Sequence, residues 1–458
     1  MKNNAKWKSG VVGRAYSTLF SSAKHTLADV LNRLPRHLGI AESFSSIPAS
    51  LATPAHSPQA FIVDSSISQH ANYADSWAEF DRIRAKKAPY IMMLGLRGFP
   101  NVQGGVESHV EHLTPLLVQL GCKLEVVVRS PYQPKTHQDA WQGVTFTRLW
   151  APKTKMLEAI VHTFLGVLYA AIKRPDILHI QAIGPALMTP LARLLGLKVV
   201  VTHHGPDYDR QKWGGVAKTM LKMGEYAGMR LSSGRIVISN VIKTLVKEKH
   251  AMHAELIFNG VNVPNLDVTD AHLQLFGLKK HRYILLVSRL VPEKRHLDLI
   301  NAFNRANIQD CKLVLVGCSD HPDAYVQTIQ QAAIDNPNIV LTGFQKGDIL
   351  KSLYTHAGLF VLPSSHEGLS ISLLEALSFG LPVVASNIQA NLEVALDDDS
   401  YFELGDVAEL AQKLQKNMQS PMTDIDKTRV RQWIATQYNW GLVAEKTYKE
   451  YERVIQAH

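Results

Sequence analysis

The sequence is poor in cysteine, and this scarcity excludes two kinds of site. Its 458 residues include only Cys122, Cys311 and Cys318, and none forms a Cys-x-x-Cys pair. An odd number of cysteines without such spacing indicates neither a disulfide framework nor a zinc site, and it fits a reducing compartment. The sequence also lacks an uncharged apolar run of about 18 residues, the length that suggests a membrane-spanning helix. It therefore predicts no membrane span.

Acidic residues are nearly absent from the first 40 positions, where Asp29 stands against seven lysines and arginines. The whole chain has a formal net charge of +9, so much of the excess lies in this one arm. A basic segment of this kind favours an anionic surface as its partner. Residues 16–34 also carry an apolar stripe at helical spacing, which suits a helix lying in a bilayer interface. A disordered tail and a cleaved targeting peptide are the alternatives.

Length and composition predict a globular protein with more than one domain. The chain is longer than a single hydrophobic core usually allows, and its apolar content of 46% and charged content of 19% are typical of folded domains. From residue 90 onward, apolar runs of strand length alternate with helical stretches, which predicts parallel sheets covered by helices on both faces. The predicted strands are 90–94, 124–128, 144–149, 177–180, 198–202, 235–238, 255–258, 283–288, 312–316, 338–342, 359–362 and 382–385.

The alternating pattern weakens once, between residues 262 and 280, and then begins again. We therefore predict an α/β protein with two doubly wound, Rossmann-like domains that face each other across a cleft. The predicted segments are a basic extension (1–86), a first domain (87–265), a linker (266–280), a second domain (281–435) and a terminal helix (436–458).

Residues 362–386 place two glutamates in a pattern of strand, loop, helix and strand. The helical part is predicted at residues 370–379, with an apolar run on either side. Glu367 is predicted in the loop before this helix and Glu375 inside it, so both lie near a helix N-terminus, where backbone N–H groups attract anions. A structural alternative is a capping box, in which Glu375 reaches back to a cap at Ser372.

This stretch resembles the E-x7-E signature of the retaining nucleotide-sugar glycosyltransferases of family four. The similarity includes flanking positions at fixed spacing, namely Pro363-Ser364, Ala376, Gly380 and Pro382-Val-Val-Ala-Ser386. Ser370 departs from the pattern, because the family most often has glycine there. The resemblance covers roughly residues 90–455 and is strongest in the second domain. It implies the GT-B arrangement of two Rossmann-like domains, with a terminal helix that crosses back onto the first domain.

Three further groups of residues follow predicted strands. Arg289 and Lys294 are close enough in sequence for a guanidinium and an ammonium to converge on a diphosphate. Gly104 and Gly105 follow the first strand, where glycines let backbone N–H groups approach a ligand. His204 ends another strand and is either a hydrogen-bonded structural residue or a ligand contact. A solvated basic turn and a tight glycine turn are the alternatives for the first two groups.

The resemblance implies roles for these residues. Arg289 and Lys294 are expected to hold the donor diphosphate and to neutralise charge on the departing nucleotide. Glu367 is expected to orient the sugar hydroxyls, and His204 to contact the transferred sugar. Glu375 is expected to bind the ribose hydroxyls of the nucleoside. The remaining donor contacts are expected from Gly104, Gly105, Gly368, Leu369 and Ser370.

The function implied by the resemblance is retaining transfer of a sugar from a nucleotide-diphosphate sugar to a glycan or lipid-linked acceptor in surface polysaccharide biosynthesis. No further cofactor and no metal are expected, since Arg289 and Lys294 meet the diphosphate and the acidic run at 397–399 lies in a polar loop. An anionic membrane is the expected peripheral partner, nucleic acid is not, and the expected location is the cytoplasm at the inner face of the plasma membrane. Alternatives are a nucleotide-sugar epimerase or a phosphorylase on the same fold, and a non-catalytic basic membrane-binding or nucleic-acid-binding protein.

Overall fold

The fold is described from a computed structural model of the chain. The structure describes residues 88–133, 139–152, 157–210, 214–319 and 323–457. These residues belong to one compact unit that begins at Lys86. The helix predicted at residues 16–34, and almost all of the predicted extension, lie outside the described residues. Within the described ranges, no helix is both long enough and apolar enough to cross a bilayer.

The first lobe contains an eight-stranded sheet with the order β3-β4-β2-β1-β5-β6-β7-β8. All neighbouring strands are parallel except β3, which pairs antiparallel with β4. The strands are β1 (Tyr90–Leu94), β2 (Lys123–Arg129), β3 (Ala140–Trp141), β4 (Val144–Leu149), β5 (Ile177–Gln181), β6 (Val199–His203), β7 (Gly234–Val237) and β8 (Glu255–Leu256). Its helices are α3 (Gly105–Gln119), α4 (Leu157–Lys173), α5 (Thr189–Leu194), α6 (Gly215–Leu231) and α7 (Asn240–His250).

The second lobe contains a six-stranded parallel sheet with the order β11-β10-β9-β12-β13-β14. The strands are β9 (Tyr283–Val287), β10 (Lys312–Val316), β11 (Ile339–Gly343), β12 (Leu359–Leu362), β13 (Val383–Ser386) and β14 (Tyr401–Phe402). Its helices are α8 (His296–Ala306), α9 (Ala324–Asp335), α10 (Gly347–Thr355), α11 (Ile371–Ser378), α12 (Gln389–Leu392), α13 (Val407–Gln419) and α14 (Asp424–Gln437).

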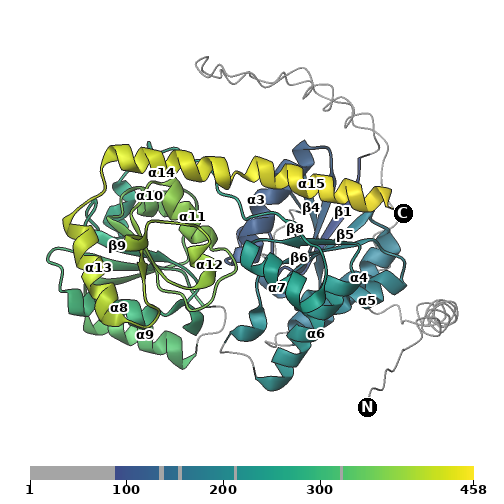
Figure 1. The fold of residues 1–458 in the computed structure, drawn as a ribbon, viewed down its shortest axis with the longest axis horizontal. Coiled ribbons are helices and arrows are strands. Elements are labelled where there is room, and N and C mark those ends of the chain that lie inside the picture. The colour runs from purple at the N-terminus through teal and green to yellow at the C-terminus, as the bar shows by residue number, and fades with distance from the viewer. Residues whose placement is uncertain (1–87, 134–138, 153–156, 211–213, 320–322, 458) are drawn as a thin grey trace, which may run out of the picture. The chain divides into compact units, whose positions relative to one another are not determined.

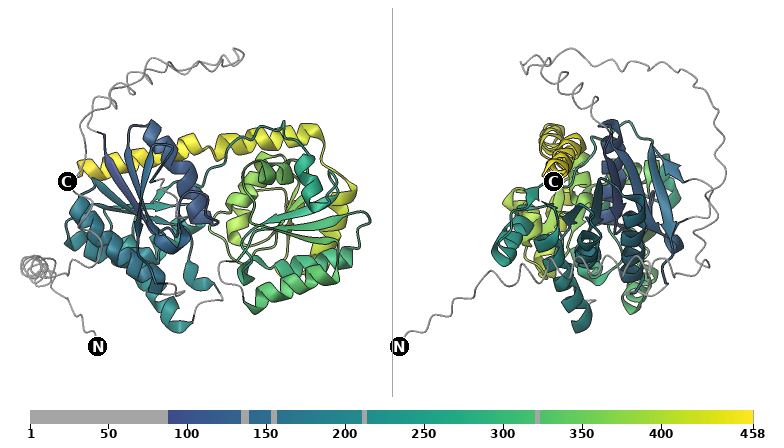
Figure 2. Two further views of the ribbon diagram at one scale, coloured as in Figure 1. Left: turned by 180° about the vertical axis from the view of Figure 1, so that it is seen from behind. Right: turned by 90° about the vertical axis from the view of Figure 1, so that its right-hand side faces the viewer.

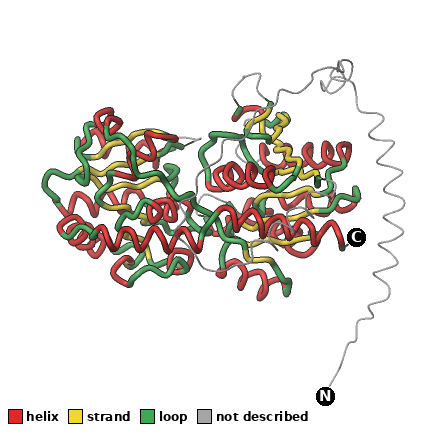
Figure 3. The backbone as a smooth tube through the Cα atoms, turned by 90° about the horizontal axis from the view of Figure 1, so that it is seen from above, coloured by secondary structure: helices red, strands yellow, loops and turns green. Residues whose placement is uncertain are grey.

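Helices cover both faces of each sheet, as the two ribbon views and the view from above show (Figures 1, 2 and 3). The inner strands are accordingly apolar along their length, and Ile284, Leu285 and Leu286 of β9 are fully buried. Every predicted strand is present, so the prediction of two doubly wound α/β domains is confirmed. The pattern missed β3 and β14, because neither lies in an apolar run of strand length, whereas the equally short β8 lies in the run at 255–258.

The strand order reverses between β1 and β5 in the first sheet and between β9 and β12 in the second. In doubly wound sheets, ligands bind outside the carboxyl ends of the strands at this point. The segment after β9 contains Arg289 and Lys294, and the segment after β12 contains Glu367. The topology of the second sheet therefore brings these separate sequence motifs to one edge.

The last two helices serve different lobes. Helix α14 packs against α11 in the second lobe, whereas α15 (Trp440–Gln456) packs against α3 in the first (Figure 1). Tyr451 of α15 places its hydroxyl 2.7 Å from Nδ1 of His179, and Lys198 donates to the carbonyl of Ile455 at 2.8 Å. The terminal segment therefore connects the second lobe to the first.

Candidate active site

Lys294 and Glu367 form an ion pair at the centre of the predicted site. Lys294 ends the 3-10 helix η6 (Pro292–Lys294), and Glu367 lies in the loop between β12 and α11. Their side chains are 16% and 9% exposed, so water screens the pair weakly. Burial alone would raise the pKa of Glu367, but the Lys294 ammonium lowers it below its usual value. The two predicted residues therefore lie in contact, with the carboxylate ionised.

Arg289 comes shortly after β9 on the same side of the site. It is partly buried, and no hydrogen bond or ion pair joins its guanidinium to another residue in the described part of the chain. Burial lowers the pKa of Arg289, and the nearby cations Arg210 and Arg97 lower it further, while Glu107 and Glu293 act in the opposite direction. A cation in such surroundings is destabilised until an anion binds beside it. The position suits a ligand with negative charge.

Glu375 is not part of a capping box, and that structural alternative is wrong. The N-cap of α11 is Ser370, whose hydroxyl accepts a hydrogen bond from the backbone N–H of Leu373 at 3.4 Å. Glu375 instead accepts a hydrogen bond from the Tyr354 hydroxyl at 2.9 Å. Burial raises the pKa of Glu375, and the bond from Tyr354 acts in the opposite direction. The carboxylate is held by a side chain of α10 rather than by the start of its own helix.

The Gly104-Gly105 loop at the start of α3 is fixed by two charged side chains. Arg97 donates from Nε to Glu107 Oε1 at 3.1 Å and also donates to the carbonyl of Gln103. Burial would raise the pKa of Glu107, but Arg97 lowers it to about 2. A Cβ atom at Gly104 would lie 2.0 Å from Glu107 Oε2, whereas one at Gly105 would meet nothing within 4 Å. A side chain at Gly104 would therefore have to displace the paired ends of Arg97 and Glu107, whereas Gly105 leaves open space in front of the helix.

His204 is held by a chain of buried polar groups behind it. Its Nε2 lies 2.8 Å from Gln181 Oε1, and Gln181 Nε2 lies 3.3 Å from Nε2 of His179. Burial lowers the pKa of His204 to about 3, so the imidazole is neutral near pH 7. Donation to the amide oxygen places the proton of His204 on Nε2. Its Nδ1 is then a hydrogen-bond acceptor.

The lobes touch where His204 meets Gly368. A Cβ atom at Gly368 would lie 2.0 Å from the carbonyl oxygen of His204, so only glycine fits there. Asn259 makes a second link, because its Oδ1 lies 2.9 Å from His109 Nδ1 while its Nδ2 donates to the carbonyl of Leu369 at 2.8 Å. In the sequence, Asn259-Gly260-Val261 lies just before the linker and matches a pattern of the resembled family, with a turn as the alternative interpretation. Its position beside the donor loop depends on the tertiary structure.

Two more contacts between the lobes were not predicted. Gln103 Oε1 accepts hydrogen bonds from the backbone N–H of Cys318 at 3.2 Å and from its thiol at 2.9 Å. Glu393 accepts hydrogen bonds at the N-terminus of α7, from Asn240 Nδ2 at 2.9 Å and from the backbone of Val241 at 3.2 Å. Glu393 follows the short helix α12, and no periodicity in the sequence indicates its partner.

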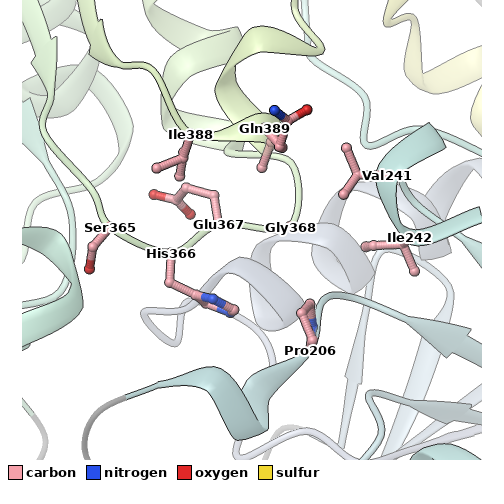
Figure 4. Close-up of a pocket in the computed structure, with 10 residues that line it drawn as sticks. Pro206, Val241, Ile242, Ser365, His366, Glu367, Gly368, Ile388 and Gln389 are labelled. Carbon is pink, nitrogen blue, oxygen red and sulfur yellow. The ribbon is translucent and has the colours of Figure 1, made fainter. Parts of the chain in front are cut away.

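A cavity of about 150 Å³ lies beside Glu367, with both lobes in its wall. The first lobe contributes Pro206, Val241 and Ile242, and the second lobe contributes residues 365–368 and 388–390. Figure 4 shows Glu367 directed toward Ile388 and His366 directed toward Pro206. A small group bound in this cavity would contact the carboxylate that pairs with Lys294.

Among the described residues, the acidic run at 397–399 interacts with helix α13 and not with Lys294, Arg289 or Glu367. Asp399 pairs with Lys416 of α13 at 2.7 Å, and Lys413 donates to its carbonyl. In the ranges that the structure describes, no group of three histidine, cysteine, aspartate or glutamate side chains is arranged to hold a metal ion.

Comparisons with known proteins agree with this architecture. Residues 270–437 match the family Glycosyl transferases group 1, and residues 103–264 match Glycosyltransferase Family 4. The structure of sucrose-phosphate synthase from Thermosynechococcus elongatus matches with a TM-score of 0.69 and 21% identity, over 81% of this chain and all of that one. HepE from Anabaena, solved with UDP and glucose, matches with a TM-score of 0.65 and 18% identity, over 80% of this chain and all of that one.

Curated relatives include two bacterial enzymes. The UDP-Gal:alpha-D-GlcNAc-diphosphoundecaprenol alpha-1,3-galactosyltransferase of Escherichia coli is 27% identical over 292 residues, which are 59% of this chain and 74% of the relative. The GDP-mannose-dependent alpha-(1-6)-phosphatidylinositol monomannoside mannosyltransferase of Mycolicibacterium smegmatis is 26% identical over 337 residues, 67% of this chain and 83% of the relative. The fold and the matched families define a GT-B glycosyltransferase. The chain belongs to the glycosyl transferases of group 1.

Proposed function

We propose that this glycosyltransferase moves a sugar from a nucleotide-diphosphate sugar to a lipid-linked or glycan acceptor, with retention at the anomeric carbon. The observation that carries the proposal is the convergence of Arg289, Lys294 and Glu367 at the ends of β9 and β12. The two cations complement a diphosphate, and the carboxylate beside the cavity complements sugar hydroxyls. The names of the two curated relatives, which refer to UDP-Gal and to GDP-mannose, support a donor of this class.

Donor binding would give Lys294 a new partner, because the diphosphate would replace Glu367 beside the ammonium. Lys294 is engaged by Glu367 in the structure. A diphosphate that enters between Arg289 and Lys294 competes for the ammonium with two negative charges instead of one. Once Lys294 contacts phosphate, Glu367 is available to accept hydrogen bonds from the sugar. The change of partner at Lys294 would therefore create both a contact for the diphosphate and an acceptor for the sugar.

The transfer step needs stabilisation of the leaving group. The bond between the anomeric carbon and the diphosphate oxygen breaks, and the acceptor oxygen bonds to that carbon on the same face. The acceptor proton passes to the departing diphosphate oxygen, and a nucleoside diphosphate leaves. Negative charge grows on that diphosphate, where Arg289 and Lys294 stabilise it electrostatically. In this scheme the two side chains supply the countercharge, and neither a metal nor another cofactor takes part.

The remaining predicted residues complete the donor site. Glu375, steadied by Tyr354, binds the ribose hydroxyls of the nucleoside. His204 presents a neutral imidazole whose Nδ1 accepts a hydrogen bond from the transferred sugar. Gly105 lets the donor approach the backbone at the start of α3. Gly104, Gly368, Leu369 and Ser370 shape the two loops that face the donor.

One of the two proposed acceptors is attached to a lipid and would be met at a membrane surface. The acceptor named for the relative from Escherichia coli is a diphosphoundecaprenol, which is a lipid. A lipid-linked acceptor is presented at a membrane surface, and the basic arm at residues 1–40 suits attraction to anionic lipid headgroups. We therefore place the enzyme in the cytoplasm at the inner face of the plasma membrane, in surface polysaccharide biosynthesis.

A panel of nucleotide-sugars tests the proposal. The wild-type protein is screened by thermal shift, because a ligand that binds the folded state raises the melting temperature. We expect one nucleotide class to stabilise the protein, and Lys294→Ala to reduce that shift. Lys279→Ala is the matched control, since Lys279 forms an exposed ion pair with Asp310. Stabilisation by no nucleotide-sugar would contradict the proposal, and conversion of the donor to its epimer without transfer would favour an epimerase.

A further inference from the structure

Arg210 of the first lobe extends its side chain toward the second. It comes directly after the 3-10 helix η4 (Asp207–Asp209), in the loop that follows β6. Its Nη2 lies 2.7 Å from Asp207 Oδ1, and its Nη1 lies 3.6 Å from Glu293 Oε1. The buried Nε of Arg210 has no hydrogen-bond partner among the described residues. The donor site described above assigns no role to this guanidinium.

Glu293 is a buried carboxylate whose hydrogen-bonding capacity is unused. It directly precedes Lys294 and is only 3% exposed. Within the described ranges, neither of its carboxylate oxygens accepts a hydrogen bond. Burying an ionised carboxylate without such bonds is costly, and a neighbouring cation reduces that cost. The 3.6 Å contact with Arg210 supplies that cation across the two lobes, but at this distance it leaves the Nη1 donor of the guanidinium available.

Two guanidinium groups of the first lobe, those of Arg210 and Arg97, lie within electrostatic range of Arg289. Arg210 and Arg97 are the cations that act most strongly on Arg289, and both disfavour its charged form. Arg97 is held by Glu107, whereas Arg289 makes no ion pair with a described residue. An anion with two charges would relieve this repulsion. A diphosphate has that charge and offers several oxygens to planar, forked donors.

We propose that Arg210 is a third diphosphate-binding residue, supplied by the first lobe beside Arg289 and Lys294 of the second. This inference rests on the function proposed above. Asp207 and Glu293 keep the guanidinium near the site, and the incoming phosphate oxygens replace the loose contact with Glu293. The diphosphate belongs either to the nucleotide donor or to a diphosphate-linked acceptor, since both present the same chemistry.

The donor source is tested by calorimetric titration of the full-length protein. UDP, GDP and ADP are compared with UMP, GMP and AMP, so that each pair differs by one phosphate. We expect Arg210→Gln to weaken binding of the preferred nucleoside diphosphate about tenfold and binding of its monophosphate less than about twofold, because charge-assisted hydrogen bonds are strong. Arg210→Lys keeps the positive charge but loses the forked geometry of the guanidinium. Its affinity for the nucleoside diphosphate is expected to lie between those of the wild type and Arg210→Gln. Arg429→Gln, at an exposed arginine of α14, is the matched control.

The variant has a structural side effect that must be separated from binding. Arg210→Gln leaves Glu293 buried without its cation, which lowers stability by itself. The substitution is therefore also made in a Glu293→Gln background, where no buried charge is left unpaired. The loss of diphosphate affinity on adding Arg210→Gln is expected to remain about tenfold in this background. A loss that disappears there would show that Arg210 acts only through Glu293, and it would overturn the proposal.

The acceptor source is tested with farnesyl diphosphate, a minimal lipid diphosphate, added to protein saturated with the preferred nucleoside diphosphate. Weaker binding of farnesyl diphosphate alone in Arg210→Gln assigns the residue to the acceptor, and weaker binding of the nucleoside diphosphate assigns it to the donor. If Arg210→Gln leaves the affinity for both ligands unchanged, the proposal is overturned. Arg289→Gln is the positive control, because it should still weaken nucleotide binding if the proposed function is correct. If wild-type protein binds no nucleoside diphosphate, the proposed function fails and this inference fails with it.

Discussion

The Lys294 ammonium contacts Glu367 Oε1 at the point where the second sheet reverses its strand order. The residues are 73 positions apart in sequence, but β9 and β12, which precede them, are neighbours in the sheet. The contact joins the part of the site that suits a diphosphate to the part that suits a sugar. Because the pair is largely shielded from water, removing one partner changes the electrostatics of the other.

Lys294→Ala is expected to lower kcat by about 100-fold to 1000-fold, because the charge that the lysine meets grows as the nucleotide leaves. The KM for the acceptor should change much less. Steady-state kinetics with the acceptor varied at saturating donor measures both quantities. Lys279→Ala removes an exposed lysine from an ion pair and should leave both unchanged. A loss confined to acceptor affinity would show that Lys294 has been assigned the wrong role.

Ser370→Ala is expected to lower stability, whereas Glu375→Gln is expected to weaken nucleotide binding. Ser370→Ala removes the N-cap of α11 and should lower the free energy of unfolding by about 1 kcal/mol. Glu375→Gln keeps an acceptor for the Tyr354 hydroxyl, so the free energy of unfolding should stay within about 1 kcal/mol while nucleotide binding weakens. Urea denaturation and calorimetry measure the two effects. An early-melting Glu375→Gln variant with normal nucleotide binding would assign Glu375 a structural role instead.

The fold was predictable because buried parallel strands leave continuous apolar runs in the sequence. Local spacing also located the residues that follow those strands, including Arg289 and Glu367. The alternative of a cap at Ser372 was wrong, because the helix begins at Ile371 and its N-cap is Ser370. The links between lobes were not predictable, because contacts such as Asn259 with Leu369 join residues 110 positions apart and leave no periodic signal.

Activity is expected to persist after treatment with EDTA, because Arg289 and Lys294 supply the positive charge at the diphosphate in the proposed scheme. Initial rates of transfer are compared before and after chelation and dialysis. Arg289→Gln serves as the reference, since it should lower the rate under both conditions. Loss of activity on chelation that Mn²⁺ or Mg²⁺ restores would contradict the metal-independent scheme.

The full-length protein is expected to sediment with vesicles that contain anionic lipid at low salt, and deleting residues 1–86 should weaken this binding. The first 40 residues carry seven basic side chains and one acid, and exposed charges of this kind are screened by salt. Deleting the arm removes both its charges and its apolar stripe at residues 16–34. Replacing only the arm lysines by glutamine keeps the stripe and therefore isolates the effect of charge. Hydrolysis of a soluble donor should be unchanged in both variants. Equal sedimentation of the full-length and deleted forms would contradict a role for the arm as the main anchor.

Stability is expected to fall as the pH decreases from 6.5 to 4.5, because five buried histidines resist protonation. Burial lowers the pKa from the ordinary histidine value of 6.5 to about 4 for His162 and to about 3 for the other four, which are His109, His179, His204 and His296. The unfolded chain therefore binds protons in this window that the folded chain does not. The stabilisation is complete above pH 6.5 and decreases by up to about 1.4 kcal/mol per pH unit for each histidine.

Urea denaturation at several pH values between 4.5 and 7.5 measures this dependence. Carboxylates with lowered pKa values, such as Glu107 at about 2, lose their contribution mainly below pH 4.5 and do not obscure the histidine window. His204→Gln should reduce the slope of the free energy of unfolding against pH by the contribution of one histidine. His253→Gln is the matched control at a side chain that is 81% exposed. A free energy of unfolding that stays constant from pH 6.5 to 4.5 would show that these histidines accept protons in the folded state, and it would contradict the neutral His204 in the proposed site.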